Sequence, residues 1–291
     1  MQESDPSPRS EAFVLHGPSD SAHPLVLDSP HSGRALPGDF GSALDERSLR
    51  TGEDCDVDRL YLPAVDRGVP LLAARVSRLY LDVNREASDV DPELLDAPWP
   101  GLAEPSRKAR LGKALVWRTL DDGRPIYERR LTTHELRQRI ERFHAPYHGA
   151  LCRLLDAAHA RFGQVVHLNC HSMNAVSGVN GEGGAGKARA DFVLGDRDGS
   201  TCDPGLTAFV HDTLAGMGYD VKVNDPFKGV ALVQLYSNPR AGRHSLQVEI
   251  NKRLYMDEAT QQPHAGFEPL QRNLLRLIDA LIDWSRGQAA R

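Results

Sequence analysis

The chain has 291 residues, a formal net charge of −5 at pH 7, and 40% hydrophobic and 26% charged residues. This composition is ordinary for a globular enzyme, and the net acidity gives no basic footprint for nucleic acid or an anionic membrane. No apolar run approaches the roughly 20 residues that a membrane-spanning helix needs, and the polar first ten residues lack the apolar core of a signal peptide. Four irregularly spaced cysteines favour a reducing compartment. We therefore expect a cytoplasmic protein without a nucleic-acid or membrane partner.

Strands and helices interleave along the chain, which indicates a layered α/β domain. Residues 1–22 are predicted to form a flexible N-terminal arm, and residues 23–291 a single domain. Short apolar or alternating runs predict strands at 24–29, 70–74, 79–83, 165–170, 190–194, 219–223, 230–236 and 245–250. Apolar residues at helical spacing predict helices at 57–65, 132–162, 204–217 and 267–284. Residues 36–52 are expected to be a loop with one short helix.

The boundaries of the long helix over 132–162 have local signals. Thr132 and Glu135 fit a capping box at its start, and Pro146 removes a backbone donor, so the helix should kink or split there. Before this helix, residues 86–130 carry many Pro, Gly and charged residues with weak periodicity. We expect them to form a long excursion over one face, as a lid or an oligomer contact.

Two of the predicted buried strands end in a histidine. The run Pro24–Ser29 breaks at Pro30 and leads to His31, and Val165–Cys170 leads to His171. Open α/β sheets place their ligands at strand ends, and two imidazoles there suggest two ligands of one metal ion. A lone strand-end histidine is more often structural, so the hypothesis depends on the matching context of the pair.

A catalytic zinc site commonly takes a carboxylate as third protein ligand and leaves one position for water. Glu53 and Asp54, just before the helix predicted over 57–65, are the candidates. The alternative for both is an ordinary role at a helix N-terminus, where negative charge is favourable. The residues alone leave this choice open.

Two further charged residues are candidates for catalysis and substrate binding. Alternation along the last predicted strand puts Gln247, Glu249 and Asn251 on one face. This pattern indicates simple solvent exposure or, for Glu249, a general base and acid aimed at a metal-bound water. Arg85 follows an apolar run and is suited either to clamping a substrate carboxylate through two parallel hydrogen bonds or to a salt bridge with an Asp.

The segment Gly181–Ala188 nearly matches a phosphate-binding loop. Ala188 stands where that loop needs Ser or Thr for magnesium, and the segment begins some way past its strand. A mobile loop over the metal site is the favoured interpretation, with nucleotide binding as the weaker alternative.

Five motifs follow one another in the order Ser29–Gly33, Asp82–Arg85, His171–Met173, Arg189–Asp196, and Gly242–Asn251 with Leu254–Glu258. Together they resemble the N-formylglutamate amidohydrolase (N-formylglutamate deformylase) family over about residues 24–258. That family is related to the zinc carboxypeptidases. The resemblance implies a three-layer αβα fold of the phosphorylase/hydrolase-like kind, with a mixed, mostly parallel sheet between helices and the metal at strand ends.

The resemblance also implies one zinc ion held by His31, His171 and a carboxylate. The carboxypeptidase pattern His-x-x-Glu is not met, since Arg34 stands three residues after His31. Asp54 is the choice for the third ligand, because its segment is similar to the acidic segment of the family, and Glu53 is the alternative.

Other roles follow from the same resemblance. Glu249 matches the catalytic glutamate of the related enzymes, and Asn84 and Arg85 match their substrate-carboxylate pair. The chain departs from many members at Gln234, where they carry an Arg in a strand, and this departure bears on the preference for formylglutamate.

The implied activity is zinc-dependent hydrolysis of N-formyl-L-glutamate to formate and L-glutamate, as in histidine degradation. The partner is then a small N-acyl amino acid, and the protein a monomer or small homo-oligomer. The alternatives are a related zinc hydrolase of another N-acyl amino acid or short peptide, and a non-catalytic metal- or nucleotide-binding protein.

Overall fold

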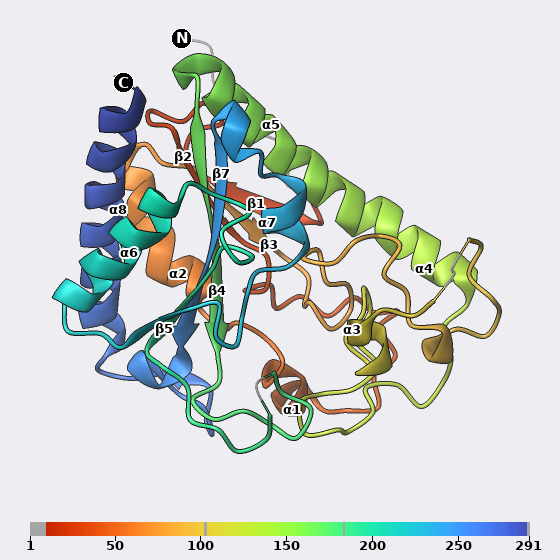
Figure 1. Cartoon of the computed structure of the whole chain (residues 1–291). Coiled ribbons are helices and arrows are strands. Elements are labelled where there is room, and N and C mark those ends of the chain that lie inside the picture. The colour runs from red at the N-terminus through yellow and green to blue at the C-terminus, as the bar shows by residue number, and fades with distance from the viewer. Residues whose placement is uncertain (1–9, 102–103, 183, 290–291) are drawn as a thin grey trace, which may run out of the picture.

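A mixed seven-stranded sheet forms the centre of the computed structural model, which describes residues 10–101, 104–182 and 184–289 (Figure 1). The strand order is β1-β3-β2-β4-β7-β5-β6. The pairs β1–β3 and β5–β7 are antiparallel, and the other four pairs are parallel. The strands are β1 Phe13–His16, β2 Leu25–Ser29, β3 Leu71–Ala74, β4 Val165–Met173, β5 Phe192–Gly195, β6 Val221–Val223 and β7 Arg243–Asn251. A separate hairpin pairs β8 Met256–Asp257 with β9 Gln262–Pro263.

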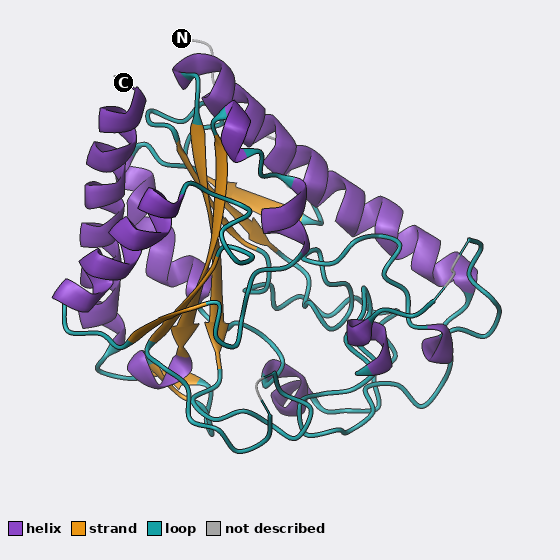
Figure 2. Ribbon diagram, in the orientation of Figure 1, coloured by secondary structure: helices purple, strands orange, loops and turns teal. Residues whose placement is uncertain are grey.

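Helices cover both faces of this sheet (Figure 2). The first face carries α2 Val57–Tyr61, α6 Pro204–Gly216 and α8 Phe267–Ala289, and the second carries α5 Ala145–Phe162 and α7 Ala231–Leu235. The expected three-layer αβα arrangement with a mixed, mostly parallel sheet is therefore confirmed. None of the helices in the described ranges combines the length and apolar character needed to cross a bilayer.

The three central strands β2, β4 and β7 run parallel to one another. Every residue of β2 and β4 is buried, as expected for parallel strands with both faces covered. Leu25 of β2 lies opposite Val166 of β4, and His171 of β4 lies opposite Glu249 of β7. The carboxyl ends of the three strands therefore meet at one edge of the sheet.

Part of the predicted N-terminal arm is a strand of the sheet. Phe13–His16 pairs antiparallel with β3, with Phe13 opposite Ala74. Residues 1–9 of the arm lie outside the described residues, and the organisation of residues 23–291 as one domain stays a prediction.

Two of the strand predictions are wrong. Residues 79–83 form a turn, in which the backbone N–H groups of Tyr80 and Leu81 donate to the carbonyl oxygen of Ser77 at 3.0 and 3.2 Å. Residues 230–236 contain helix α7 instead. Both segments are short apolar runs, and periodicity alone does not separate a strand from a buried turn or helix in such runs.

The excursion over residues 86–130 has little regular structure where it is described. It contains a 3₁₀ helix at Pro92–Leu94 and helix α3 at Arg107–Arg110. Its apolar side chains pack with those of residues 76–81 in a hydrophobic cluster beside the sheet. The short helix expected within 36–52 is α1, Glu46–Arg50. The excursion's role as a lid or oligomer contact stays a prediction.

The long helix is split ahead of Pro146. It consists of α4 Thr133–Arg139, a π-helical turn at Ile140–His144, and α5. Pro146 occupies the first turn of α5, where its missing N–H is tolerated. Both hydrogen bonds of the capping box are present: Thr132 Oγ1 accepts from Glu135 N at 3.1 Å, and Glu135 Oε2 accepts from Thr132 N at 2.7 Å.

Replacement of this N-cap tests its contribution to stability. Thr132→Ala should lower the free energy of unfolding by about 1 kcal/mol, because it leaves one helix N–H without its acceptor. Thr133→Ala, one residue into the helix, is the matched control and should change stability by only a few tenths of that amount. Urea unfolding of both variants measures the difference, and equal effects would show that the capping hydrogen bond contributes nothing.

Candidate metal centre

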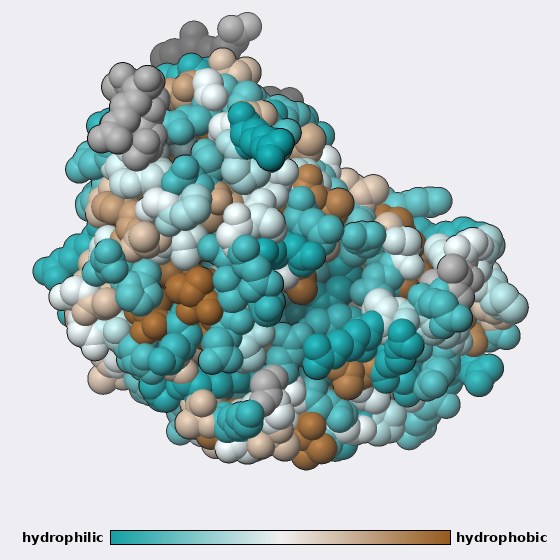
Figure 3. All heavy atoms as spheres, viewed as in Figure 1, coloured by the Kyte–Doolittle hydropathy of each residue, from teal (hydrophilic) through white to brown (hydrophobic). Residues whose placement is uncertain are grey.

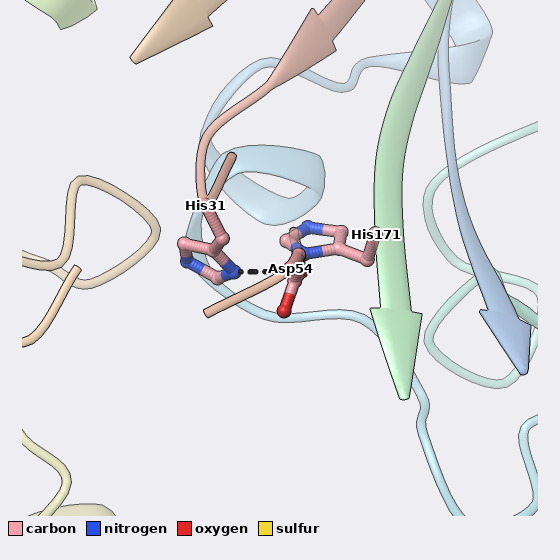
Figure 4. Close-up of side chains that lie close together, drawn as sticks. All are labelled: His31, Asp54 and His171. Carbon is pink, nitrogen blue, oxygen red and sulfur yellow. Dashed lines mark hydrogen bonds and ion pairs between the residues drawn. The ribbon is translucent and has the colours of Figure 1, made fainter. Parts of the chain in front are cut away.

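Three side chains from distant parts of the chain converge at the carboxyl edge of the central strands. His31 lies in the turn after β2, Asp54 in the loop before α2, and His171 within β4 (Figure 4). One ligand atom from each lies within 4.8 Å of the other two. Asp54 Oδ2 is 3.3 Å from His31 Nδ1 and 3.0 Å from His171 Nδ1. All three residues are at least 97% buried.

The other nitrogen of each imidazole is already engaged. His31 Nε2 is 2.7 Å from Asp82 Oδ1, and His171 Nε2 is 2.7 Å from Asn169 Oδ1. Asn169 donates through Nδ2 to Asp28 Oδ1 at 2.7 Å, which fixes the orientation of its amide. A neutral imidazole carries one proton. Asp82 favours that proton on Nε2 of His31, which would leave the Nδ1 lone pair of this ring facing Asp54. His171 Nε2 faces the acceptor Asn169 Oδ1 and also the donor Asn84 Nδ2 at 3.0 Å, so its contacts are compatible with either tautomer.

This donor set fits a divalent metal ion. Two imidazole nitrogens and a carboxylate oxygen are common zinc ligands, and metal-binding histidines usually donate their other N–H to a carboxylate or carbonyl oxygen. Without a metal ion, a ring with its proton on Nδ1 donates it to Asp54 Oδ2. A metal ion would take the place of these protons among the same three atoms.

The protonation states agree with ligand roles. Burial opposes ionisation of Asp54, but hydrogen bonds with His171 and His31 hold the pKa of this carboxyl group well below its usual range. Burial, followed by the charge of His31, lowers the pKa of His171 to about 4. Asp54 is therefore an anion and His171 a neutral imidazole near pH 7, which are the forms that bind metal.

Glu53, the alternative third ligand, is engaged elsewhere. Its two carboxylate oxygens accept from Arg50 Nη1 at 3.0 and 2.8 Å, and the residue is fully buried. The structure therefore brings Asp54, and not Glu53, to the two histidines.

Glu249 lies beside His171 on the neighbouring strand, because the two residues are paired in register. It is 6% exposed, and its Oε1 accepts from Gln247 Nε2 at 2.8 Å. The polar face of β7 is therefore buried against the site, and solvent exposure does not explain the alternation. Burial, reinforced by the charge of Asp54, raises the pKa of Glu249 well above its usual value.

Asn84 and Arg85 also reach the site. Asn84 Nδ2 lies 3.0 Å from His171 Nε2. Arg85 is 5% exposed, donating through Nε to the carbonyl oxygen of Lys113 at 3.0 Å and through Nη1 to that of Asn84 at 2.9 Å. Both residues line the same cavity as the histidines. Their binding of a substrate carboxylate stays a prediction.

Several residues that hold the site in place were assigned no role from the sequence. Asp82 contacts His31, and its Oδ2 also accepts from Arg78 Nη2 at 2.9 Å and Trp117 Nε1 at 3.1 Å. Asn169 and His171 alternate along β4 and therefore share a face. That alternation was a usable signal for Asn169, whereas Asp82 and Arg78 lie in a turn and carry no periodic signal.

The glycine-rich segment does not have the context of a phosphate-binding loop. It leads into β5, whereas such a loop leads into a helix. Its first glycine allows close packing instead: a Cβ on Gly181 would lie 3.0 Å from the backbone oxygen of Gly178 and 3.3 Å from Arg189 Nη2. The segment forms part of the wall of the site.

A cavity of about 330 Å³ surrounds the three candidate ligands and Glu249. Figure 3 shows that this face of the molecule is hollowed, with mainly hydrophilic residues around the hollow. The basic residues of the lining are Arg78, Arg85, Arg107, Lys108, Lys113, Arg189, Lys228 and Lys252. Gln234, which was expected in a strand, lies on helix α7 and lines a neighbouring hollow rather than this cavity.

Comparisons with known proteins agree with this architecture. The sequence profile of the N-formylglutamate amidohydrolase family matches residues 23–256. The N-formylglutamate deformylases of Pseudomonas aeruginosa and Pseudomonas putida are 29% and 30% identical, over 92% and 90% of this chain and 96% and 93% of theirs.

Two solved structures share the fold. N-formylglutamate amidohydrolase from Ralstonia eutropha JMP134 is 43% identical with a TM-score of 0.88, covering 96% of this chain and 99% of its own. A gene product of Agrobacterium tumefaciens, 18% identical with a TM-score of 0.65, covers 93% and 96% and shows the fold alone. On the profile match and these relatives, the chain belongs to the N-formylglutamate amidohydrolase family.

Proposed function

We propose that the protein is a zinc-dependent amidohydrolase that cleaves N-formyl-L-glutamate to formate and L-glutamate. The observation that carries the proposal is the convergence of His31 Nδ1, Asp54 Oδ2 and His171 Nδ1 beside a buried glutamate in a predominantly basic cavity. The names of the relatives from Pseudomonas and Ralstonia support the substrate. A cytoplasmic location, a role in histidine degradation and a monomer or small homo-oligomer remain predictions.

His31, Asp54 and His171 would hold the metal ion. When bound, zinc supplies Lewis acidity, which lowers the pKa of water and polarises an acyl oxygen. The donor set of two nitrogens and one oxygen leaves room for water and substrate. Asp82 and Asn169 keep the two imidazole rings in the orientation that this requires.

Glu249 performs the proton transfers in this proposal. Its carboxylate takes a proton from the water that attacks the formyl carbon, and the resulting acid returns that proton to the nitrogen of the departing glutamate. A carboxyl group that both accepts and donates a proton near neutral pH works best with a raised pKa, and burial raises that of Glu249. Arg85 and Asn84 would hold the α-carboxylate, so that the formyl amide lies next to the metal ligands.

Formate release from N-formyl-L-glutamate tests the activity directly. We expect turnover that is lost after dialysis against a chelator and restored by Zn²⁺, measured with a formate dehydrogenase assay. N-acetyl-L-glutamate and dipeptides that carry glutamate are the comparison substrates, and faster cleavage of either would assign the protein to another acyl group. Full activity in chelator-treated protein shown to be free of metal would refute the metal requirement.

The ligand assignment is tested by the adjacent pair of carboxylates. Asp54→Asn should lower zinc affinity by more than the roughly 10- to 100-fold that loss of an outer-shell partner costs. Glu53→Gln, which removes a charge that faces Arg50 rather than the two histidines, should retain the metal and lower only the melting temperature. Elemental analysis and zinc titration of both variants give the answer. Retention of zinc by Asp54→Asn with loss in Glu53→Gln would reverse the assignment.

The role of Glu249 is tested by Glu249→Gln. This change keeps the shape of the side chain and removes the proton acceptor, so kcat should fall by about 10²- to 10⁴-fold while zinc content stays at the wild-type level. Glu268→Gln, on the surface of α8 with 83% of its side chain exposed, is the control and should leave kcat unchanged. A near-normal kcat in Glu249→Gln would exclude this residue as the general base.

A further inference from the structure

The basic residues of the cavity differ in whether a carboxylate neutralises them. Four of the eight are paired, and the pairs are Arg78 with Asp54 and Asp82, Lys108 with Glu182, Lys113 with Asp121, and Lys228 with Asp198. Arg107 is exposed on α3. Arg85 lies 3.7 Å from Asp82 through Nη2. Arg189 and Lys252 are buried, and neither has a carboxylate within 4.0 Å among the described residues.

The guanidinium of Arg189 is held only weakly by the protein. Nη1 donates to the carbonyl oxygen of Asn174 at 3.3 Å and Nη2 to that of Glu182 at 3.5 Å, while the buried Nε has no partner. The guanidinium carbon lies 4.9 Å from the centre of the Phe227 ring. Despite these weak contacts, Arg189 is buried, with only 9% of its surface exposed. Burial lowers the pKa of its guanidinium, although the negative charge of Glu249 acts in the opposite direction.

The backbone of Arg189 is fixed, in contrast to its side chain. Its N–H donates to the carbonyl oxygen of Ala175 at 2.9 Å, and its own carbonyl oxygen accepts from Asn251 Nδ2 at 3.2 Å. Asn251 is the last residue of β7, and Lys252 follows it. Lys252 is 5% exposed and donates through Nζ to Asn174 Oδ1 at 3.0 Å. Two buried cations therefore share Asn174 just beyond the end of the strand that carries Glu249.

A buried cation without an anionic partner is costly, and a guanidinium pairs best with a carboxylate through two parallel hydrogen bonds. We propose that Arg189, assisted by Lys252, binds the side-chain carboxylate of the substrate and so selects N-acyl amino acids with an acidic side chain. This inference rests on the proposed function, and it names a residue that determines specificity.

The location of Arg189 suits a second carboxylate subsite. Asn84 and Arg85 come from the chain that follows β3, whereas Arg189 comes from the loop before β5. In the sheet, β2, β4 and β7 lie between β3 and β5. His171 lies on β4 and Glu249 on β7, and His31 lies in the turn after β2. N-formyl-L-glutamate has carboxylates on both sides of its amide-bearing carbon. An α-carboxylate at Arg85 and a side-chain carboxylate at Arg189 would hold both ends.

The test compares two substrates that differ only in the side-chain charge, N-formyl-L-glutamate and N-formyl-L-glutamine. Arg189→Met removes the charge and keeps most of the length. It should lower kcat/KM for the glutamate compound by about 10- to 100-fold, the range expected for a hydrogen-bonded ion pair. It should change kcat/KM for the glutamine compound by less than about 3-fold. Arg189→Lys should recover part of the loss, because it restores the charge but not the two-point contact.

Two variants make the comparison specific. Arg85→Met should lower kcat/KM for both substrates alike, because both carry the α-carboxylate. Lys222→Met removes an exposed cation of β6 that lies outside the cavity lining, and should leave both values within about 2-fold. Equal losses for the two substrates in Arg189→Met would overturn the proposal, since they would indicate a general effect on Glu249 or on the fold.

A binding measurement separates this proposal from the proposed function. Calorimetric titration of the zinc-loaded protein with L-glutamate and L-glutamine does not depend on turnover. We expect wild-type protein to bind glutamate more tightly, and Arg189→Met to lose that preference while its melting temperature stays near the wild-type value. If wild-type protein releases no formate but shows this preference, the hydrolytic proposal fails and the subsite stands. If binding does not distinguish the two ligands, the subsite proposal fails.

Discussion

The carboxylate oxygen Asp54 Oδ2 meets Nδ1 of His31 and Nδ1 of His171 at one buried point, and the surrounding structure holds this contact in place. Asp82 Oδ1 lies 2.7 Å from His31 Nε2 and favours a proton there, which turns the Nδ1 lone pair of this ring toward Asp54. His171 Nε2 has both an acceptor, Asn169 Oδ1, and a donor, Asn84 Nδ2, within 3.0 Å. A buried carboxylate needs hydrogen-bond donors or a cation. The two imidazoles can meet this need as N–H donors to Asp54, or can bind a metal ion together with it.

A buried polar stripe along the sheet keeps this geometry in place. Asp28 of β2 is fully buried and accepts from Tyr147 Oη at 2.8 Å, from His167 Nε2 at 3.0 Å and from Asn169 Nδ2 at 2.7 Å. These contacts fix the amide of Asn169 and, through it, the ring of His171. Because the carboxylate has three donors, its burial is compensated locally. The orientation of the metal ligands thus depends on a hydrogen-bond chain that begins on a neighbouring strand.

The predictable part of the site follows from the parallel strands. Continuous apolar runs identify strands covered on both faces, and each run that ends in a histidine must deliver it to the same edge of the sheet. For this reason His31, His171 and Glu249 could be grouped from the sequence although they are far apart in it. The resemblance to the family favoured Asp54 over Glu53, whereas the residues alone left the choice open. The structure distinguishes these adjacent residues by their contacts with His31 and Arg50.

The parts that were not predictable lack a repeating pattern. Residues 79–83 are apolar because they fill a cluster beside the sheet, and an apolar run in a turn has the same composition as one in a strand. Asp82 and Arg189 gain their roles from three-dimensional contacts of irregular segments. Helix α7 occupies residues 231–235, which resemble a strand because the helix is too short to reveal its period. Hydrophobic periodicity therefore identifies the main strands and helices, whereas much of the cavity wall comes from segments that have no periodic pattern.

The charge of the cavity is the opposite of the charge of the chain. The whole sequence carries a net charge of −5, yet the lining has eight basic side chains against the four acidic ones, Asp54, Asp121, Glu182 and Glu249. Net charge governs solubility and long-range association, whereas the field inside a cleft depends on the few charges in its walls, which low-dielectric surroundings focus. An acidic chain is therefore compatible with an anionic substrate. The loops that carry the basic residues set the sign of the potential where the reaction takes place.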